Sequence, residues 1–226
     1  MRGTFYGIGV GPGDPELMTL KAINTIAVCD VIAVPDSGTD NQLALSIASD
    51  HIGIKPILSL DLPMIHNKFD LQKKRELASE AICLELNMGK NVGFLTLGDP
   101  MIYSTYSYLH RIVVSRGHTV KVVPGVTSFC AAAAALGEPL CEGSQLLHII
   151  PALYNDTENA LKLNGTKVLM KSNKKLNEIV DLLREKDIGA KIAQRVGMDG
   201  ERLYQNLQTD VETDYFSIVV INEDEK

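Results

Sequence analysis

The 226-residue sequence has no long basic run and no extended apolar segment. Its 22 Lys and Arg are outnumbered by 28 Asp and Glu, which leaves a formal net charge of −6. Because nucleic acid is bound by clustered Lys and Arg, this balance argues against a nucleic-acid partner. The apolar runs fall short of the roughly 20 residues that a membrane helix needs, so no membrane partner is expected. The start of the chain lacks a signal-peptide pattern, and we expect a cytoplasmic protein.

Cysteine is scarce, and the spacing of the cysteines excludes two kinds of site. Cys29, Cys83, Cys130 and Cys141 form no C-x-x-C pair, and a disulfide scaffold is not expected in a chain of this length. We expect four buried free thiols. The five histidines are also scattered, so the sequence predicts no metal site of its own.

The chain is 45% hydrophobic, and its first half alternates short apolar runs with amphipathic segments. This alternation predicts βα units around a largely parallel sheet. Strands are expected over residues 5–10, 30–35, 55–60, 91–97 and 119–123. Helices are expected from residue 16 onward and over 41–51, 70–88 and 103–115, with Gly89 after the end of the third.

The character of the chain shifts near Pro124 and Gly125, where an Ala-rich helix is expected to begin. The last expected strands follow one another through turns such as Asp199-Gly200, which predicts an antiparallel portion. The sequence therefore predicts a two-domain α/β fold, with domains 1–122 and 123–226 and a mixed second sheet. Strands are expected over 146–150, 167–171, 190–196, 202–207 and 216–221, and helices over 127–136, 156–163 and 174–186.

The first motif, Gly7 to Pro15, reads GIGVGPGDP. It is not the Rossmann fingerprint, because the sixth position counted from Gly7 is Pro12 and that counted from Gly9 is Asp14, where Gly or Ala is required. The glycines allow close backbone approach to a ligand. The alternative is a purely structural turn.

The second motif follows an expected strand and runs from Leu97 to Tyr106, LGDPMIYSTY. The carboxyl ends of parallel strands are where open α/β sheets bind ligands. Asp99 is held extended by the proline that follows it. The alternative is an ordinary turn with Ser104 near the start of a helix.

The third motif, Pro124 to Ser128, opens the Ala-rich helix at the expected domain junction. Thr127 or Ser128 is either a helix cap or a ligand contact in a cleft between domains.

In order and spacing, the three motifs together resemble those of the tetrapyrrole methylase family, G-x-G-P-G-D-P, G-D-P and P-G-[IV]-[ST]-[SA]. The resemblance covers essentially the whole chain. Leu62-Pro63-Met64, the 103–106 run and the 168–171 run look like the C20-methyltransferases that act on precorrin-2 or its cobalt-containing counterpart, cobalt-factor II. This implies a homodimer that methylates C20 of a tetrapyrrole in cobalamin biosynthesis. The methyl donor would be S-adenosylmethionine, bound in the cleft between the two domains.

The resemblance also implies site residues, although it identifies no catalytic base. Those implied for the cofactor are Pro12, Leu97, Gly98, Asp99, Ile102, Thr127, Ser128, Met170 and Gly197. Those implied for the substrate are Met64, His66, Tyr103 and Ser104.

The implied substrate carries many carboxylates, so an acidic protein must offer it local cations. Lys68, Lys73, Lys74 and Arg75 are the candidates, and the alternative is a solvated helix face.

Three other functions stay open. The first two, a methylase for another corrin carbon and a diphthine synthase-like enzyme, are disfavoured by the 103–106 run. The third, a non-catalytic tetrapyrrole-binding protein, is disfavoured by the intact cofactor-loop motifs.

Overall fold

The computed structural model describes residues 2–36, 39–63, 67–154, 156–172, 175–208 and 210–222. The chain divides into two compact units, unit 1 (Met1–Thr127) and unit 2 (Ser128–Lys226). The division falls after residue 127, whereas the sequence places it after residue 122. The strand over Thr119–Val123 is part of the sheet of unit 1, so the chain leaves this unit only after that strand ends.

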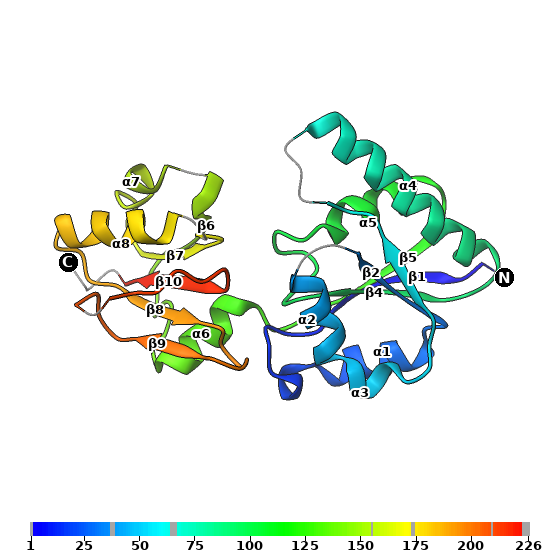
Figure 1. Ribbon diagram of the computed structural model, residues 1–226, viewed down its shortest axis with the longest axis horizontal. Coiled ribbons are helices and arrows are strands. Elements are labelled where there is room, and N and C mark those ends of the chain that lie inside the picture. The colour runs from blue at the N-terminus through cyan, green and yellow to red at the C-terminus, as the bar shows by residue number, and fades with distance from the viewer. Residues whose placement is uncertain are drawn as a thin grey trace. The chain divides into compact units, whose positions relative to one another are not determined.

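Unit 1 contains a five-stranded sheet in which every pair of neighbours is parallel, as the alternating pattern predicts. The strand order is β3-β2-β4-β1-β5 (Figure 1). Helices cover both faces, which explains why the strands are continuous apolar runs. The strands are β1 (Thr4–Gly9), β2 (Val31–Pro35), β3 (Ile57–Leu60), β4 (Val92–Thr96) and β5 (Thr119–Val123).

The helices of unit 1 form two layers. Helices α4 and α5 close a core on one face of the sheet around Phe5, Phe94 and Tyr106. The helices between β1 and β3 close the other core around Ile8, Ile32 and Leu95 (Figure 1). The helices are the 3-10 helix η1 (Pro15–Leu17), α1 (Leu20–Val28), α2 (Thr39–Ile47), α3 (Ser49–Ile52), α4 (Lys68–Asn87) and α5 (Tyr106–Ser115).

Several helix predictions are wrong in detail. The helix expected from residue 16 onward begins at Leu20, after the separate 3-10 helix η1, and the helix expected over 156–163 ends at Ala160. The single helix expected over 41–51 is broken into α2 and α3. The helix expected from Tyr103 begins at Tyr106, because Tyr103 has a positive φ of 49° and cannot continue a right-handed helix. Gly89 has φ 84° directly after α4, as expected for a residue that ends a helix.

Unit 2 contains a mixed sheet in the order β6-β7-β10-β8-β9. The β6/β7 pair is parallel and the other three pairs are antiparallel, as predicted. Helix α8 packs on one face and α6 on the other. The elements are α6 (Ser128–Leu136), β6 (Leu147–Pro151), the 3-10 helix η2 (Ala152–Tyr154), α7 (Thr157–Ala160), β7 (Thr166–Met170), α8 (Leu176–Glu185), β8 (Lys191–Gln194), β9 (Arg202–Tyr204) and β10 (Ser217–Ile221).

The expectation of four buried thiols is wrong for two of the cysteines. Cys29 and Cys83 are buried, and burial raises the pKa of the Cys29 thiol to about 12. Cys130 and Cys141 are exposed. Helix α6 turns Ala132 and Leu136 toward the sheet of unit 2, which leaves Cys130 on its outer side.

Within the described ranges, no helix has both the length and the hydropathy needed to cross a membrane. The same residues contain no group of three or more His, Cys, Asp and Glu that could hold a metal ion.

Candidate functional site

The three sequence motifs meet at the carboxyl edge of the sheet in unit 1. Strands β4, β1 and β5 are neighbours, so the segments that follow them begin side by side. The amide of Val10 donates to the carbonyl of Thr96 (3.0 Å), and the amide of Gly98 donates to the carbonyl of Gly11 (2.7 Å). The first two motifs are therefore joined through their backbones.

Asp99 joins the second motif to the third. Its Oδ2 accepts a hydrogen bond from the amide of Gly125 at 3.0 Å. Its Oδ1 accepts one from the amide of Met101 at 2.8 Å, which closes the turn after Pro100. The Asp99 carboxylate thus holds this loop in place by binding backbone amides, and its contact with a cofactor stays a prediction.

Close packing between protein segments explains most of the glycine pattern. A Cβ on Gly9 would lie 2.5 Å from the carbonyl oxygen of Gly98 and 2.6 Å from the amide nitrogen of Gly125. A Cβ on Gly7 would lie 2.2 Å from the ring of Tyr106. These glycines bring three loops and a ring together rather than approaching a pyrophosphate, so the Rossmann spacing is not needed.

The loop after β4 presents apolar side chains to solvent. Met101, Ile102 and Tyr103 are 54%, 40% and 47% exposed. Tyr103 also has a left-handed backbone, which is strained for a residue with a Cβ. Exposed apolar side chains in a strained loop are typical of a ligand-binding surface.

Thr96, the last residue of β4, is a residue that the sequence reasoning did not assign. Its Oγ1 is buried without a hydrogen-bond partner. A buried hydroxyl in that state lacks the partner that such groups ordinarily have, and the signal in the sequence is its place just before the G-D-P loop. Thr127 Oγ1 is likewise buried without a partner.

Other predicted residues of unit 1 have structural contacts. Pro12 is buried, and Leu97 packs against the core beneath α1 to α3. Ser104 Oγ accepts a hydrogen bond from the amide of Tyr106 at 3.1 Å, the role that the alternative interpretation gave it. Met64 and His66 lie outside the described residues.

In unit 2, Met170 and Gly197 lie at one edge of the sheet. Met170 ends β7 and is paired with Ile218 of β10, which is paired on its other side with Ala193 of β8. The chain leaves β8 through a turn in which Arg195 and Gly197 have φ values of 52° and 72°. Ser128 is the first residue of α6, which packs on this sheet.

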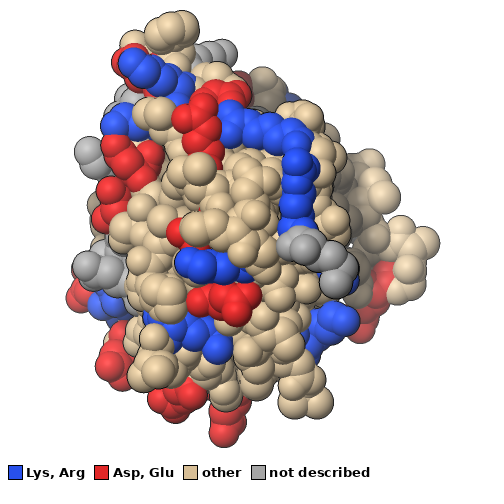
Figure 2. All heavy atoms as spheres, turned by 90° about the vertical axis from the view of Figure 1, so that its right-hand side faces the viewer, with Lys and Arg blue, Asp and Glu red and all other residues tan. Residues whose placement is uncertain are grey.

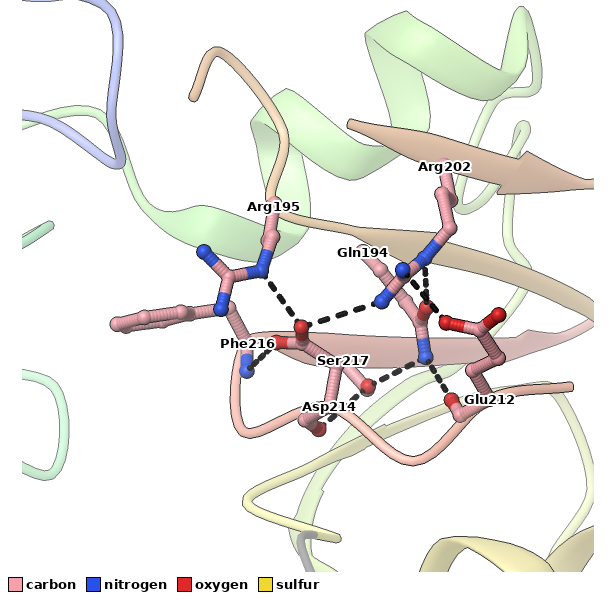
Figure 3. A network of polar contacts seen from close by, with 7 residues as sticks. All are labelled: Gln194, Arg195, Arg202, Glu212, Asp214, Phe216 and Ser217. Atoms are coloured by element: carbon pink, nitrogen blue, oxygen red, sulfur yellow. Dashed lines mark hydrogen bonds and ion pairs between the residues drawn. The ribbon is translucent and has the colours of Figure 1, made fainter. Parts of the chain in front are cut away.

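A buried carboxylate holds the turn that contains Gly197 (Figure 3). Asp214 is 8% exposed, and its Oδ2 accepts from Arg195 Nε at 2.6 Å and from Arg202 Nη2 at 3.2 Å. Its Oδ1 accepts from the amide of Phe216 at 2.8 Å. The turn then closes with a hydrogen bond from the amide of Met198 to the carbonyl of Arg195 (2.9 Å).

Gln194, which is fully buried, extends this network (Figure 3). Its Nε2 donates to the carbonyl of Glu212 (2.7 Å) and to Ser217 Oγ (3.0 Å), and its Oε1 accepts from Arg202 Nε (2.9 Å). With its polar groups satisfied, the network gives the turn after β8 a single geometry.

The candidate cations on α4 do not form one uniform face. Lys74 forms an ion pair with Asp61, and the guanidinium of Arg75 lies over the ring of Tyr108. Lys73 is exposed, and the Lys68 side chain lies outside the described residues. On the face of unit 1 that carries the N-terminus, Figure 2 shows acidic and basic side chains interspersed among uncharged ones. On this face, attraction of an anionic ligand must come from local groups of cations.

Solved structures identify the class of this fold. A cobalt precorrin-4 methyltransferase superposes with a TM-score of 0.78 at 19% identity, covering 97% of this chain and 94% of that one. A uroporphyrin-III C-methyltransferase from Thermus thermophilus, complexed with S-adenosylhomocysteine, superposes with a TM-score of 0.72 at 21% identity, covering 98% and 92%. The two units together thus have the fold of the tetrapyrrole methyltransferases.

The sequence places the chain within one family. The model of the tetrapyrrole (corrin/porphyrin) methylases matches residues 4–211, and the chain belongs to that family. The family predicted from the three motifs is therefore confirmed.

Relatives match over nearly the whole chain. A probable cobalt-precorrin-2 C(20)-methyltransferase of Methanocaldococcus jannaschii is 36% identical, over 96% of this chain and 94% of its own. The cobalt-precorrin-2 C(20)-methyltransferase of Salmonella typhimurium is 31% identical, over 98% and 97%. A precorrin-2 C(20)-methyltransferase of Sinorhizobium is 28% identical, over 97% and 95%.

Proposed function

We propose that this protein transfers a methyl group from S-adenosylmethionine to C20 of precorrin-2 or its cobalt-containing counterpart in cobalamin biosynthesis. The observation that carries the proposal is the match, over nearly the full length of both chains, with relatives named for this reaction, at up to 36% identity. The meeting of the three family motifs at one sheet edge supports it.

The described residues fit S-adenosylmethionine as the methyl donor. The 97–102 loop offers apolar side chains at Met101 and Ile102 and a left-handed turn at Gly98. We propose that cofactor binding depends on this loop together with Pro12, Thr127 and Ser128. In unit 2, we propose that it depends on Met170 and Gly197, whose turn is held by Asp214.

When bound, the donor supplies a methyl group already activated on a sulfonium. The protein's contribution is then to align donor and acceptor, and correct placement alone supplies several kcal/mol in well-oriented reactions, about 7–11 in favourable cases. Tyr103 and Ser104, at the end of the exposed loop, are proposed substrate contacts, as are Met64 and His66. The residue that takes the C20 proton is not assigned.

The experiment is anaerobic incubation of the protein with S-adenosylmethionine and precorrin-2, with and without cobalt. We expect the mass of the tetrapyrrole to rise by one methylene, and carbon-13 label from the donor methyl to appear at C20 by NMR. Label at another carbon would identify a different corrin methylase. Binding of the tetrapyrrole without methylation would identify a non-catalytic binding protein.

We further propose that the protein acts as a homodimer, as the family resemblance implies, and that it is cytoplasmic, as expected from the lack of a signal-peptide pattern.

A further inference from the structure

Two arginines from different helices of unit 1 lie over one tyrosine ring. The guanidinium carbon of Arg75, on α4, is 3.4 Å from the centroid of the Tyr108 ring. That of Arg111, one helical turn after Tyr108 on α5, is 5.1 Å from the same centroid. Tyr108 is 39% exposed and Arg111 is exposed, so the cluster is open to solvent.

These two guanidinium groups have no acidic partner among the described residues. Arg116, Arg195 and Arg202 each bind a carboxylate, but no ion pair of the described chain includes Arg75 or Arg111. The carboxylate of Glu76, next to Arg75 in the sequence, accepts hydrogen bonds from Gln72 Nε2 (3.0 Å) and Arg116 Nη2 (2.7 Å) instead. Although the chain has a net charge of −6, neither of these cations is neutralised by an ion pair of the described residues.

One donor of the cluster is buried as well. Arg75 Nε is buried and has no hydrogen-bond partner. Arg75 Nε therefore faces the protein and is closed to a ligand, so an anion would bind the outer part of the cluster. Because two guanidinium groups that share one ring repel, an anion placed here would relieve that cost.

The cluster lies toward the same edge of the sheet as the three motifs. Tyr108 is in the first turn of α5, where its amide donates to the carbonyl of Thr105 at the end of the exposed loop. Arg75 lies about 10 Å along α4 from the first residue of that helix, at 1.5 Å per residue. Both helices follow parallel strands and pack against each other, so their first turns lie near the carboxyl ends of those strands.

We propose that Arg75 and Arg111, aligned by the ring of Tyr108, bind one carboxylate on the periphery of the tetrapyrrole substrate. This inference rests on the proposed function, since it assigns a specificity role to these residues in that reaction. Stacking on a ring fixes the plane of a guanidinium and leaves its N–H edge free, which suits bidentate binding of a carboxylate.

The test compares Arg75→Gln, Arg111→Gln and the double variant with Lys21→Gln, which removes an exposed charge from α1, on the other face of the sheet. We expect each arginine variant to raise the KM for the tetrapyrrole by about tenfold, and Lys21→Gln to change it less than about twofold. Because both arginines would bind the same carboxylate, the double variant should raise KM by less than the product of the single effects.

Two further measurements separate recognition from a structural role. The Kd for S-adenosylmethionine, measured by calorimetry, should stay within about twofold of the wild-type value in every variant. Arg75→Lys should raise the tetrapyrrole KM less than Arg75→Gln does. Lysine keeps the positive charge but cannot bind a carboxylate in the bidentate geometry. An unchanged tetrapyrrole KM in both single variants would overturn the proposal while leaving the methyltransferase function intact.

If the wild-type protein methylates neither form of precorrin-2, the proposed function fails. The carboxylate site is then measured directly by titration with uroporphyrin III, which carries eight carboxylates. Weaker binding to the arginine variants than to Lys21→Gln would support the site, and equal binding would overturn it.

Discussion

The side chain of Tyr106 shows why the glycine-rich first motif has its sequence. This residue is fully buried, and its ring occupies the space beside Gly7. Its hydroxyl hydrogen-bonds with His110 Nδ1 (3.1 Å) and donates to the carbonyl of Lys121 (3.3 Å), and burial raises the pKa of the phenol. Tyr106, in the second motif, thus requires a glycine at position 7 of the first motif.

Gly98 should be essential for cofactor binding. It has φ 70° and donates its amide to Gly11, so a β-branched side chain would strain the turn. We expect Gly98→Val to weaken S-adenosylmethionine binding by about tenfold or more, measured by calorimetry.

Gly117→Val is the matched control, because Gly117 also has a positive φ of 77° but lies away from the motifs. A Cβ on Gly117 would come within 4 Å of no described atom beyond its own chain neighbours. Gly117→Val should lower the free energy of unfolding and leave the affinity for S-adenosylmethionine unchanged. Wild-type affinity in a folded Gly98→Val protein would remove the loop from the site.

His118 should make stability depend on pH. The ring is buried, its Nδ1 has no partner, and burial together with Arg2 and Arg116 lowers its pKa below 6.5. The unfolded chain therefore binds the proton more readily than the folded one. This contribution to stability is complete above pH 6.5 and is lost as the pH falls through 6.5 toward the folded-state pKa.

Urea unfolding at pH 8 to 5 measures the effect. The contribution of one group is at most about 1.4 kcal/mol per pH unit, and His118→Gln should remove it from the slope. An identical slope in wild type and His118→Gln would show that His118 does not cause the dependence.

At the scale of elements, the turn after β8 depends on a residue of the segment before β10. Asp214 binds both Arg195 and Arg202, so the approach to the last strand determines the shape of a loop that begins 19 residues earlier in the chain. The 97–105 loop, which follows β4, is similar. Asp99 binds the amide of Gly125, which follows β5, and strand β1 lies between β4 and β5.

Asp214→Asn should loosen the turn. The amide would place a donor or a weaker acceptor against two guanidinium groups, and we expect a loss of about 1–3 kcal/mol in the free energy of unfolding. S-adenosylmethionine binding should weaken as well, because the proposed cofactor contact at Gly197 depends on this turn. Urea denaturation and calorimetry measure the two effects.

Glu212→Gln is the comparison, since the Glu212 side chain is 73% exposed and pairs with the same Arg202. An exposed pair contributes less than about 1 kcal/mol, so this variant should stay close to wild type. Equal losses in the two variants would show that burial of Asp214 is not what makes it important.

At the scale of the whole molecule, the proposed homodimer predicts a particle mass of twice the 24.7 kDa chain. Light scattering at micromolar concentration measures it. Leu77 and Leu84 of α4 and Met88, which caps this helix, are 51%, 64% and 61% exposed, which is in keeping with a surface that is covered by a partner. A monomeric mass at that concentration would contradict the proposal.

Much of this protein could be predicted from local sequence. The alternation of apolar runs and amphipathic segments determined the parallel first sheet, and the Asp199-Gly200 turn region indicated the antiparallel portion of the second. The spacing of the three motifs determined the family. Side-chain periodicity and turn preferences predict these features, and both are local properties that do not depend on contacts between distant residues.

Only the tertiary structure decided which of these residues meet. The strand order β4-β1-β5 brings Gly9, Gly98 and Gly125 together. The hydrogen bond between Asp99 and the amide of Gly125 is a consequence of that order. Packing of α4 on α5 places Arg75 over Tyr108, and the antiparallel pairing of β8 with β10 lets Asp214 reach Arg195. A contact between residues far apart in the chain depends on strand order and helix packing, and a local pattern specifies neither.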